Sequence, residues 1–517
     1  MNFKNNASYL KSIKCADVYT ESQADYVLPD YLGDVRKILF TEASLRPSGR
    51  FAGGEEVEFS GVVIYNVIYL DSEGEISSVE FTSDYDYSVR CDADSYSDSI
   101  ADTRVSNYAV RLVGPRKISA KVSLVGSVRL TENSAISASG DAFDGESEPE
   151  INRDSVKIRQ TKTSSSTERE YAESVARLEG AICDEVRVVY AAVEPVVDSV
   201  EATKDGASIK GRIRMWAIVK NADEPAYQVE KTVSFDETVD FEGITPDMSL
   251  IPALSVSSVR SNVNADEGGC EIVLSAIVEF CVIGEGNGEV DVVLDGYLID
   301  SPTENSYDEF CYTRLSSVFT SKISHTSEIN RSELENEGLR EIIFLTATPK
   351  IESVERSDSE YTVIGEIGFS GIASEMNGDK ISYTGIKFSS PFSENIGIKN
   401  SEKMQIETSL RATNASATLD AEKLYATCSL EINVVATEQE KKTVLSSMSR
   451  IEEEESSSEG AKITVYYPSP DESLFSVAKR FRTSMTKVAK DNDITESVFS
   501  SDNPGGNLRG VKKLVIY

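Results

Sequence analysis

One histidine, His325, is the only imidazole in a chain of 517 residues, so the chain has little of the usual equipment for acid–base catalysis. His325 lies in the polar stretch SKISHTSEIN, which predicts a surface position. The sequence has no nucleophile elbow (G-x-S-x-G), no phosphate-binding loop (G-x-x-x-x-G-K-[ST]) and no H-E-x-x-H zinc motif. Carboxylates are numerous enough for a paired-carboxylate glycosidase, but no acidic pair stands out from a polar strand face. We therefore predict a protein that is not an enzyme, with no cofactor and no metal.

The cysteines also fail to form a chemical motif. There are seven, an odd number, and none is part of a C-x-x-C pair. This predicts neither a disulfide framework nor a zinc knuckle, and it favours a reducing cytosol.

Charge and length limit the class of protein further. The formal net charge of −35 is spread along the chain, which makes nucleic acid and anionic lipid poor partners. Two explanations of this charge remain open, simple solubility and a cationic protein partner. No apolar run has the length of a signal peptide at the N-terminus or of a membrane span elsewhere, so we expect a cytoplasmic protein with no membrane insertion.

Any binding group must be positioned by the strands of the chain, and one strand pattern occurs three times in the sequence. In residues 57–69 alternate positions are apolar, and the same pattern returns 150 and 304 residues later. Period-two alternation is typical of half-buried antiparallel strands. Each copy has a glycine at the same place (Gly61, Gly211 and Gly365), which predicts a β-bulge or a close backbone approach. The single tryptophan, Trp216, falls on the face opposite the apolar stripe, where it is either buried against a neighbouring element or an exposed contact.

These patterns predict a mainly β fold, with three repeated β-sandwich-like modules followed by a small α+β (βααβ) module. The predicted boundaries are an N-terminal tail (1–21), module 1 (22–133), a polar linker (134–178), module 2 (179–302), a linker (303–335), module 3 (336–442), an acidic tether (443–460) and the end module (461–517). A flexible tether would let the end module sample a volume around the body.

The end module has the order strand, helix, helix, strand. A short strand precedes the turn residues 468–471, Ser473 is placed as an N-cap, and apolar residues then recur at helical spacing to Phe481. A second helix is expected from Thr483 or Ser484 to Asn492, and residues 511–517 form a closing strand. Phe475, Val477, Phe481 and Leu514 are the expected core.

This module resembles the LysM domain, through residues 473–481, Thr483, residues 492–494 and residues 513–516. LysM modules usually bind N-acetylglucosamine glycans between two loops, which here are residues 468–473 and 501–510. The module carries nine Lys and Arg against six Asp and Glu, a net charge of +3 on an acidic body, which favours an acidic protein patch instead. The candidate binding residues are Asp471, Glu472, Ser473, Arg482, Lys487, Asp502, Asn503, Asn507 and Arg509.

The first β module resembles the SPOCS domain. The matching positions are Pro29-Asp30, Ile38-Leu39, Gly61, Tyr65, Val67, Tyr69, Asp71 and residues 116–119; the other two modules match only through the internal repeat. SPOCS domains followed by LysM are typical of spore-envelope morphogenetic proteins of endospore-forming bacteria. The resemblance implies a scaffold on the mother-cell side of the developing spore coat. Its LysM tip would dock the coat ATPase SpoIVA (stage IV sporulation protein A), and its SPOCS modules would recruit other coat proteins.

Two functions are therefore consistent with the sequence. One is a scaffold of the spore coat whose end module binds protein. The alternative is a carbohydrate-binding protein whose end module binds peptidoglycan or N-acetylglucosamine.

Overall fold

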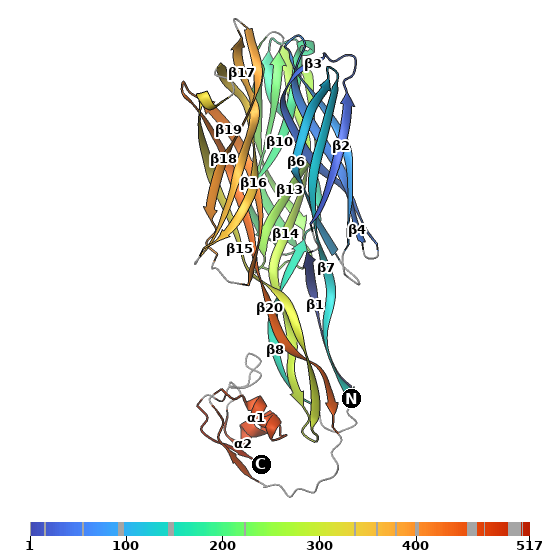
Figure 1. Cartoon of the computed structure of the whole chain (residues 1–517), viewed down its shortest axis with the longest axis vertical. Coiled ribbons are helices and arrows are strands. Elements are labelled where there is room, and N and C mark those ends of the chain that lie inside the picture. The colour runs from blue at the N-terminus through green and yellow to red at the C-terminus, as the bar shows by residue number, and fades with distance from the viewer. Residues whose placement is uncertain are drawn as a thin grey trace.

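The computed structural model describes the chain except Met1 and residues 15–16, 54–55, 91–97, 143–148, 222–223, 335–337, 358–359, 378–379, 399–402, 452–462, 470, 495–507 and 509. The chain folds mainly into β-strands, as predicted. Figure 1 shows an elongated molecule in which long strands form a body, continue into a narrower stalk and end beside a small helical tip. We call residues 463–517 the tip.

The body contains three three-stranded antiparallel sheets with the same strand order. In each sheet the middle strand in sequence is also the middle strand in space. The strands are β3 (Val35–Gly53), β4 (Glu56–Asp71) and β5 (Ile76–Arg90); β10 (Val186–Ala202), β11 (Gly206–Asn221) and β12 (Tyr227–Asp240); β16 (Leu339–Arg356), β17 (Tyr361–Asn377) and β18 (Lys380–Asn395).

Each of these sheets packs against a second layer of strands. In that layer, two strands flank one very long strand. The long strands are β7 (Lys117–Ala142), β14 (Gly269–Tyr297) and β20 (Lys423–Arg450). Their neighbours are β2 (Val18–Val27) and β6 (Asp98–Gly114); β9 (Thr167–Glu179) and β13 (Ser249–Asp266); β15 (Thr303–Asn330) and β19 (Met404–Leu419). Apolar side chains that alternate along both layers fill three separate cores, which is the arrangement that period-two strands require.

The three mid-strand glycines have the close approach that the sequence predicts. Gly61 lies opposite Tyr85 across the β4–β5 ladder, Gly211 lies opposite Phe235, and Gly365 lies opposite Phe392. In each case a side chain on the glycine would collide with the facing aromatic ring. The neighbouring strand also has a register shift beside each glycine, directly after Pro47, Val197 and Ile351, respectively. Bulge and ring contact therefore occur together.

A fourth core joins the three units of the body. At its centre Phe40, Tyr190 and Phe344 contact one another, with ring centroids 4.9 Å apart for Phe40–Phe344 and 6.0 Å apart for each of the other two pairs. These positions differ by 150 and 304 residues, the offsets that also relate the apolar strand patterns. Trp216 belongs to this core and is only 5% exposed, so of the two alternatives left open by the sequence, burial against a neighbouring element is the one that holds.

The stalk consists of three two-stranded antiparallel ribbons. Each ribbon pairs the end of a long strand with another strand: β1 (Asn2–Lys14) with β7, β8 (Glu150–Thr163) with β14, and the first half of β15 with β20. A small apolar cluster from all three ribbons, including Tyr9, Val156 and Phe310, holds them together.

The prediction that the tail and the two linkers are irregular chain is therefore wrong. Residues 1–21 contain β1 and the start of β2, residues 134–178 contain the end of β7, β8 and most of β9, and residues 303–335 are mostly β15. The predicted tether begins inside β20, and residues 452–460 of it lie outside the described part of the chain. These segments are poor in large apolar residues because a ribbon buries little surface, and ladder hydrogen bonds rather than a wide core hold it.

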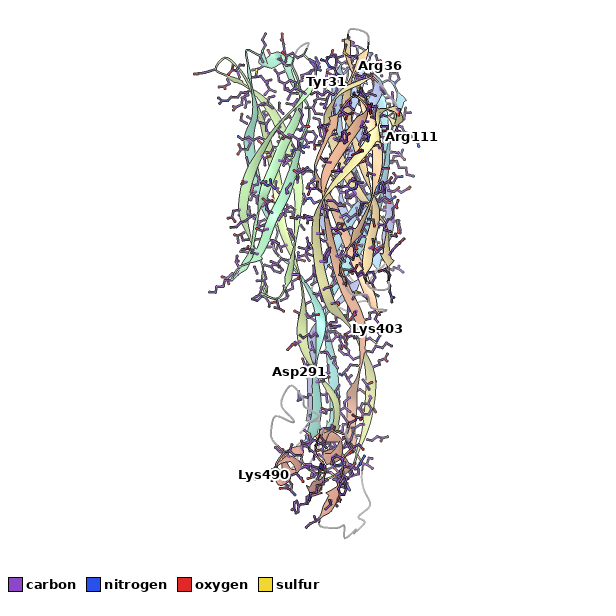
Figure 2. The ribbon with its side chains drawn as sticks, turned by 90° about the vertical axis from the view of Figure 1, so that its left-hand side faces the viewer. Tyr31, Arg36, Arg111, Asp291, Lys403 and Lys490 are labelled. Atoms are coloured by element: carbon purple, nitrogen blue, oxygen red, sulfur yellow. A yellow bond between two sulfur atoms is a disulfide. The ribbon has the colours of Figure 1, made fainter. Side chains whose placement is uncertain are left out.

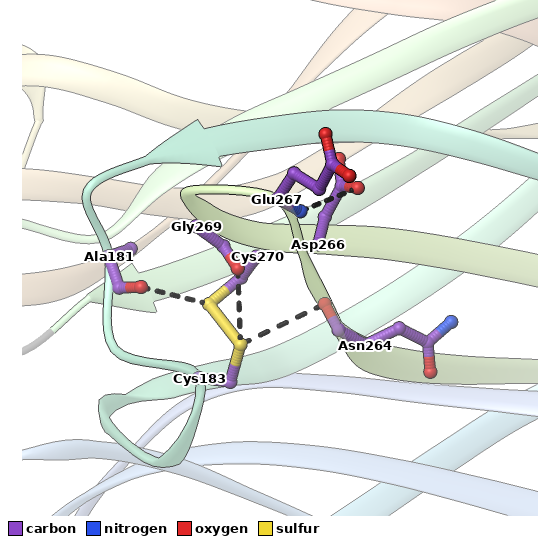
Figure 3. The surroundings of a disulfide bond; sticks show 7 residues. All are labelled: Ala181, Cys183, Asn264, Asp266, Glu267, Gly269 and Cys270. Carbon is purple, nitrogen blue, oxygen red and sulfur yellow. Dashed lines mark hydrogen bonds between the residues drawn. A yellow bond between two sulfur atoms is a disulfide. The ribbon is translucent and has the colours of Figure 1, made fainter.

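The cysteines give a second correction. Cys183, in the short 3-10 helix η1 (Cys183–Glu185), is disulfide-bonded to Cys270 on β14, with Cα atoms 5.5 Å apart (Figure 3). The two are 87 residues apart in sequence, so no local spacing could reveal the pair. Because disulfides are uncommon in reducing compartments, the cysteines no longer favour a cytosolic location.

Candidate docking site

The tip has the predicted order of elements: β21 (Thr464–Tyr466), α1 (Leu474–Arg480), α2 (Met485–Asp491) and β22 (Leu514–Ile516). Ser473 is the N-cap of α1, and its side chain forms a reciprocal capping box with Ser476. Of the four expected core residues, Phe475, Val477 and Leu514 are buried, and Phe481 is half-buried against the same core.

Two of the nine candidate binding residues have structural roles instead. Ser473 is occupied as the helix cap. Glu472 accepts hydrogen bonds from the Tyr466 hydroxyl at 2.8 and 2.9 Å and from the Ser469 amide at 3.1 Å, and it pairs with Arg480 at 3.3 Å. The bond to Glu472 raises the pKa of Tyr466, because the carboxylate favours the protonated phenol. Glu472 therefore stabilises the first loop rather than offering itself to a partner.

The other candidates are exposed or lie outside the described residues. Asp471, Arg482 and Lys487 are exposed. Arg482, which follows α1, has a positive φ of 46°, a backbone conformation that favours glycine at the end of a helix. Asp502, Asn503, Asn507 and Arg509 lie outside the described residues. The structure does bring the two predicted loops together, because the Leu508 amide donates to the Glu472 carbonyl at 3.4 Å.

The sequence patterns gave no sign of a contact between the tip and the end of the stalk. Tyr297, near the end of β14, is 2% exposed; its ring packs edge-on against Phe475 at 5.2 Å, and its hydroxyl donates to the Thr483 carbonyl at 2.7 Å. The Lys479 ammonium donates to both carboxylate oxygens of Asp295, at 2.7 and 2.6 Å. Burial alone would raise the pKa of Asp295, but the hydrogen bonds from Lys479 and Tyr307 outweigh it and lower the pKa. The tip is thus docked on the stalk (Figure 2) rather than free to sample a volume around the body.

We expect Tyr297→Ala combined with Lys479→Ala to release the tip from the stalk. The double change removes the ring contact, the hydroxyl bond and the charge-assisted bonds together. Hydrogen exchange of the main chain at residues 474–484 should speed up about tenfold or more, while the melting midpoint of the body stays unchanged. Lys490→Ala, on the exposed side of α2, is the matched control. Unchanged exchange in the double variant would show that the contact does not hold the tip.

At the junction of body and stalk, an ionic cluster joins all three units of the body. Arg159 on β8 makes a bidentate bond to Glu285 on β14, at 2.9 and 2.8 Å, and also contacts Glu407 on β19 at 3.1 Å. Arg129 on β7 bonds to Glu407 and lies 3.6 Å from Glu285. Burial alone would raise the pKa of Glu407, but the two arginines outweigh it and lower the pKa. A cavity of about 340 Å³ opens beside the cluster. Of the charged residues that line it, Arg129 and Arg159 both pair with Glu407, and Lys11 is the fourth.

A second cavity, of about 280 Å³, lies where the three units meet. Glu42 lines it and accepts a hydrogen bond from the Tyr190 hydroxyl at 2.6 Å. Withdrawal of this carboxyl from water raises its pKa above the ordinary 4.5, although the bonds from Tyr190 and Asn66 oppose the shift.

The raised pKa of Glu42 predicts a pH dependence of stability. Protonated Glu42 stabilises the folded state. Its contribution to the free energy of unfolding is fully present below about pH 4.5, and it is lost as the pH rises through the raised pKa of the folded state. Glu42→Gln, which stays neutral, should therefore become more stable than the parent protein as the pH rises above this window. Urea unfolding of both proteins at pH 4.5, 6 and 8 measures the difference. A constant difference across this range would contradict the shift.

His325 lies on β15 rather than in a linker, and it is half-buried. Its Nε2 lies 2.9 Å from the Ser390 hydroxyl, and burial lowers its pKa. In the serine–histidine–carboxylate triad a third group orients the imidazole. Within the described part of the chain no carboxylate hydrogen-bonds to His325, so the pair lacks that group.

Two absences hold for the described residues only. None of their helices is long and apolar enough to cross a membrane. They contain no group of three or more His, Cys, Asp or Glu placed to hold a metal ion. Comparisons of the chain with protein-family models, with curated proteins and with solved structures found no match.

Proposed function

We propose that this chain is a non-catalytic scaffold of the spore envelope, with three copies of one SPOCS-like β module in its body and a LysM-like tip. The tip docks a coat morphogenetic protein of the SpoIVA type, and the body recruits other coat proteins from the mother-cell side of the developing spore. The observation that carries the proposal is the placement of a basic tip at the end of a long stalk on an acidic body.

Three features support a scaffold. The ionic cluster and the aromatic core tie the three units into one body, which suits a spacer better than a set of mobile binding domains. Beside the cavities, the Arg159 guanidinium is bonded to Glu285 and Glu407, and the Arg411 guanidinium donates to the Pro195 carbonyl, so both arginines contribute to holding the units together. The tip is held on the stalk at α1, which leaves the β21–β22 side directed outward.

A glycan-binding tip remains the second candidate, because its β-α-α-β order with a capped first helix is the observation that favours LysM-type sugar binding. Co-sedimentation separates the two functions. The full chain and a chain ending at Ile451 are mixed with purified peptidoglycan and, separately, passed as bait through a lysate of sporulating cells. The scaffold proposal expects tip-dependent retention of coat proteins and no tip-dependent sedimentation with peptidoglycan. The reverse result favours the glycan-binding protein.

A further inference from the structure

The cavity of about 280 Å³ where the three units meet is lined by strands from all of them, and we call it the junction cavity. Its walls come from β3 in the first unit, from β10, β11 and β13 in the second, and from β16 and β19 in the third. The volume lies near the lower limit of about 300 Å³ that is usual for small-molecule sites, so a ligand here would be small.

Glu42 brings a carboxylate into the junction cavity without a counter-ion. The Tyr190 hydroxyl donates to it at 2.6 Å and the Asn66 side chain also bonds to it, but both partners are neutral. Within the described part of the chain, no lysine or arginine lies within ion-pair distance of Glu42. A carboxylate that is withdrawn from water and has only neutral partners favours the approach of an ammonium group.

Arg411 brings the opposite charge into the same cavity. Its guanidinium donates to the Pro195 carbonyl at 2.7 Å, and no carboxylate of the described residues lies within ion-pair distance. Burial lowers the pKa of Arg411, because the attraction of Glu194 and Glu431 does not offset the loss of water. A guanidinium has five N–H donors, so a ligand carboxylate could take a bidentate bond that the protein leaves open.

The other two charged residues of the junction cavity have charged partners in the protein. Arg214 donates to Glu230 at 3.0 and 2.6 Å and lies 3.9 Å from Glu194. Glu194 also accepts a hydrogen bond from the Asn414 amide at 2.9 Å. The lining charges that lack an ion-pair partner among the described residues are therefore one carboxylate and one guanidinium.

These two charges are held at places that lie well apart. Tyr190, which bonds to Glu42, and Pro195, which bonds to Arg411, are five residues apart on β10 with no register shift between them. Five residues of extended strand span about 16 Å. Much of the remaining lining is apolar, from Ala192, Val193 and Trp216 in the second unit to Leu345 and Ala347 in the third. The cavity thus offers an anionic end, a cationic end and apolar walls.

We propose that the junction cavity binds a small linear zwitterion, with an ammonium group at one end, a carboxylate at the other and an apolar chain between them. The ammonium pairs with Glu42, the carboxylate pairs with Arg411, and the chain lies against the apolar walls. An ω-amino acid has this chemistry, whereas an α-amino acid carries both charges on one carbon and would leave one of the two protein charges unpaired. The inference does not rest on the scaffold function, because the site lies in the body and not in the tip.

Isothermal titration calorimetry on the full chain tests the inference with three matched probes. The zwitterion is ε-aminocaproate, n-hexylamine lacks its carboxylate, and caproate lacks its ammonium group. We expect ε-aminocaproate to bind about tenfold or more tightly than either of the others, because it alone pairs both protein charges. L-Leucine should bind about tenfold or more weakly than ε-aminocaproate, because its two charges cannot reach both ends.

Two variants assign the ends of the ligand. Glu42→Gln keeps an acceptor for Tyr190 but removes the charge, so it should weaken ε-aminocaproate and n-hexylamine about tenfold and leave caproate unchanged. Arg411→Met should weaken ε-aminocaproate and caproate by a similar factor and leave n-hexylamine unchanged. Glu289→Gln removes an exposed carboxylate of the stalk and is the matched control, expected to bind all three probes as the parent chain does.

A purely structural defect would weaken all three probes equally, and that result would overturn the inference. So would binding of none of the probes, which would leave the cavity to water, or ε-aminocaproate binding no tighter than its one-charge analogues. Leucine binding as tightly as ε-aminocaproate would refute the extended ligand. Thermal melting followed by circular dichroism shows that each variant is folded, and if Arg411→Met is not, the result with Glu42→Gln decides.

The outcome is separable from that of the proposed function. A chain that binds none of the probes but retains coat proteins through its tip would refute the site and leave the scaffold standing. Zwitterion binding by a chain that retains no coat protein would do the reverse.

Discussion

Glu285→Ala should lower the free energy of unfolding by about 3–5 kcal/mol, the cost of leaving a buried charge without its partner. Glu285 is 2% exposed and accepts both bonds of the Arg159 guanidinium, which is itself 5% exposed, and the hydroxyl of Thr161 donates to it at 3.0 Å. Without this carboxylate, Arg159 would retain only Glu407, which also pairs with Arg129. Urea unfolding followed by circular dichroism measures the loss.

Two further variants make this result specific. Glu289→Ala removes an exposed carboxylate on the same strand, 3.9 Å from Lys157, and should change the free energy of unfolding by about 0.5 kcal/mol or less. Arg159→Met with Glu285→Leu removes both buried charges and should recover most of the stability that Glu285→Ala loses. A loss below about 1 kcal/mol in Glu285→Ala would mean that the ionic cluster does not hold the three units together.

The second large effect is expected at the aromatic core between the units. Phe344 is 3% exposed and contacts Phe40, Tyr190 and Trp216, so Phe344→Ala should cost about 3–5 kcal/mol through lost burial and the cavity that remains. Because these contacts cross between units, the variant should also separate one unfolding transition into several.

Phe369→Ala is the matched control for this separation. Phe369 is fully buried, but it packs within one unit, stacked on Phe388 at 5.1 Å. A loss of similar size is expected there, confined first to residues 339–450 in hydrogen-exchange measurements. If both variants unfold the protein in the same single step, the core around Phe344 does not carry the coupling.

Local patterns in the sequence were enough to predict part of the fold. Alternation of apolar residues identified the strands around Gly61, Gly211 and Gly365, and helical spacing after Ser473 identified both short helices of the tip. The same alternation placed Trp216 off the main apolar stripe, which is where a contact between units would be expected.

The remaining features depend on contacts between distant residues. The sequence of the stalk strands looks like that of linkers, because ribbons that bury little surface need few large apolar residues. Sequence alone does not show the structural role of Glu472, because its pairing with Tyr466 and Arg480 depends on how the first loop folds. The contact of Tyr297 with Thr483 and the Cys183–Cys270 bond join segments far apart in the chain, and no spacing rule predicts such pairs. Asn492 could have been noticed as a polar residue after the second helix, but its hydrogen bonds to the main chain of Val515 on β22 appear only in the structure.

We propose that the tip brings this chain to a protein of the spore envelope. The most direct test follows a fluorescent fusion of the full chain, beside one ending at Ile451, in sporulating cells of an endospore-forming bacterium. The scaffold account predicts a ring around the forespore for the full chain and diffuse mother-cell fluorescence for the shortened chain. A full chain that stays diffuse, or that decorates the cell wall in growing cells, would contradict it.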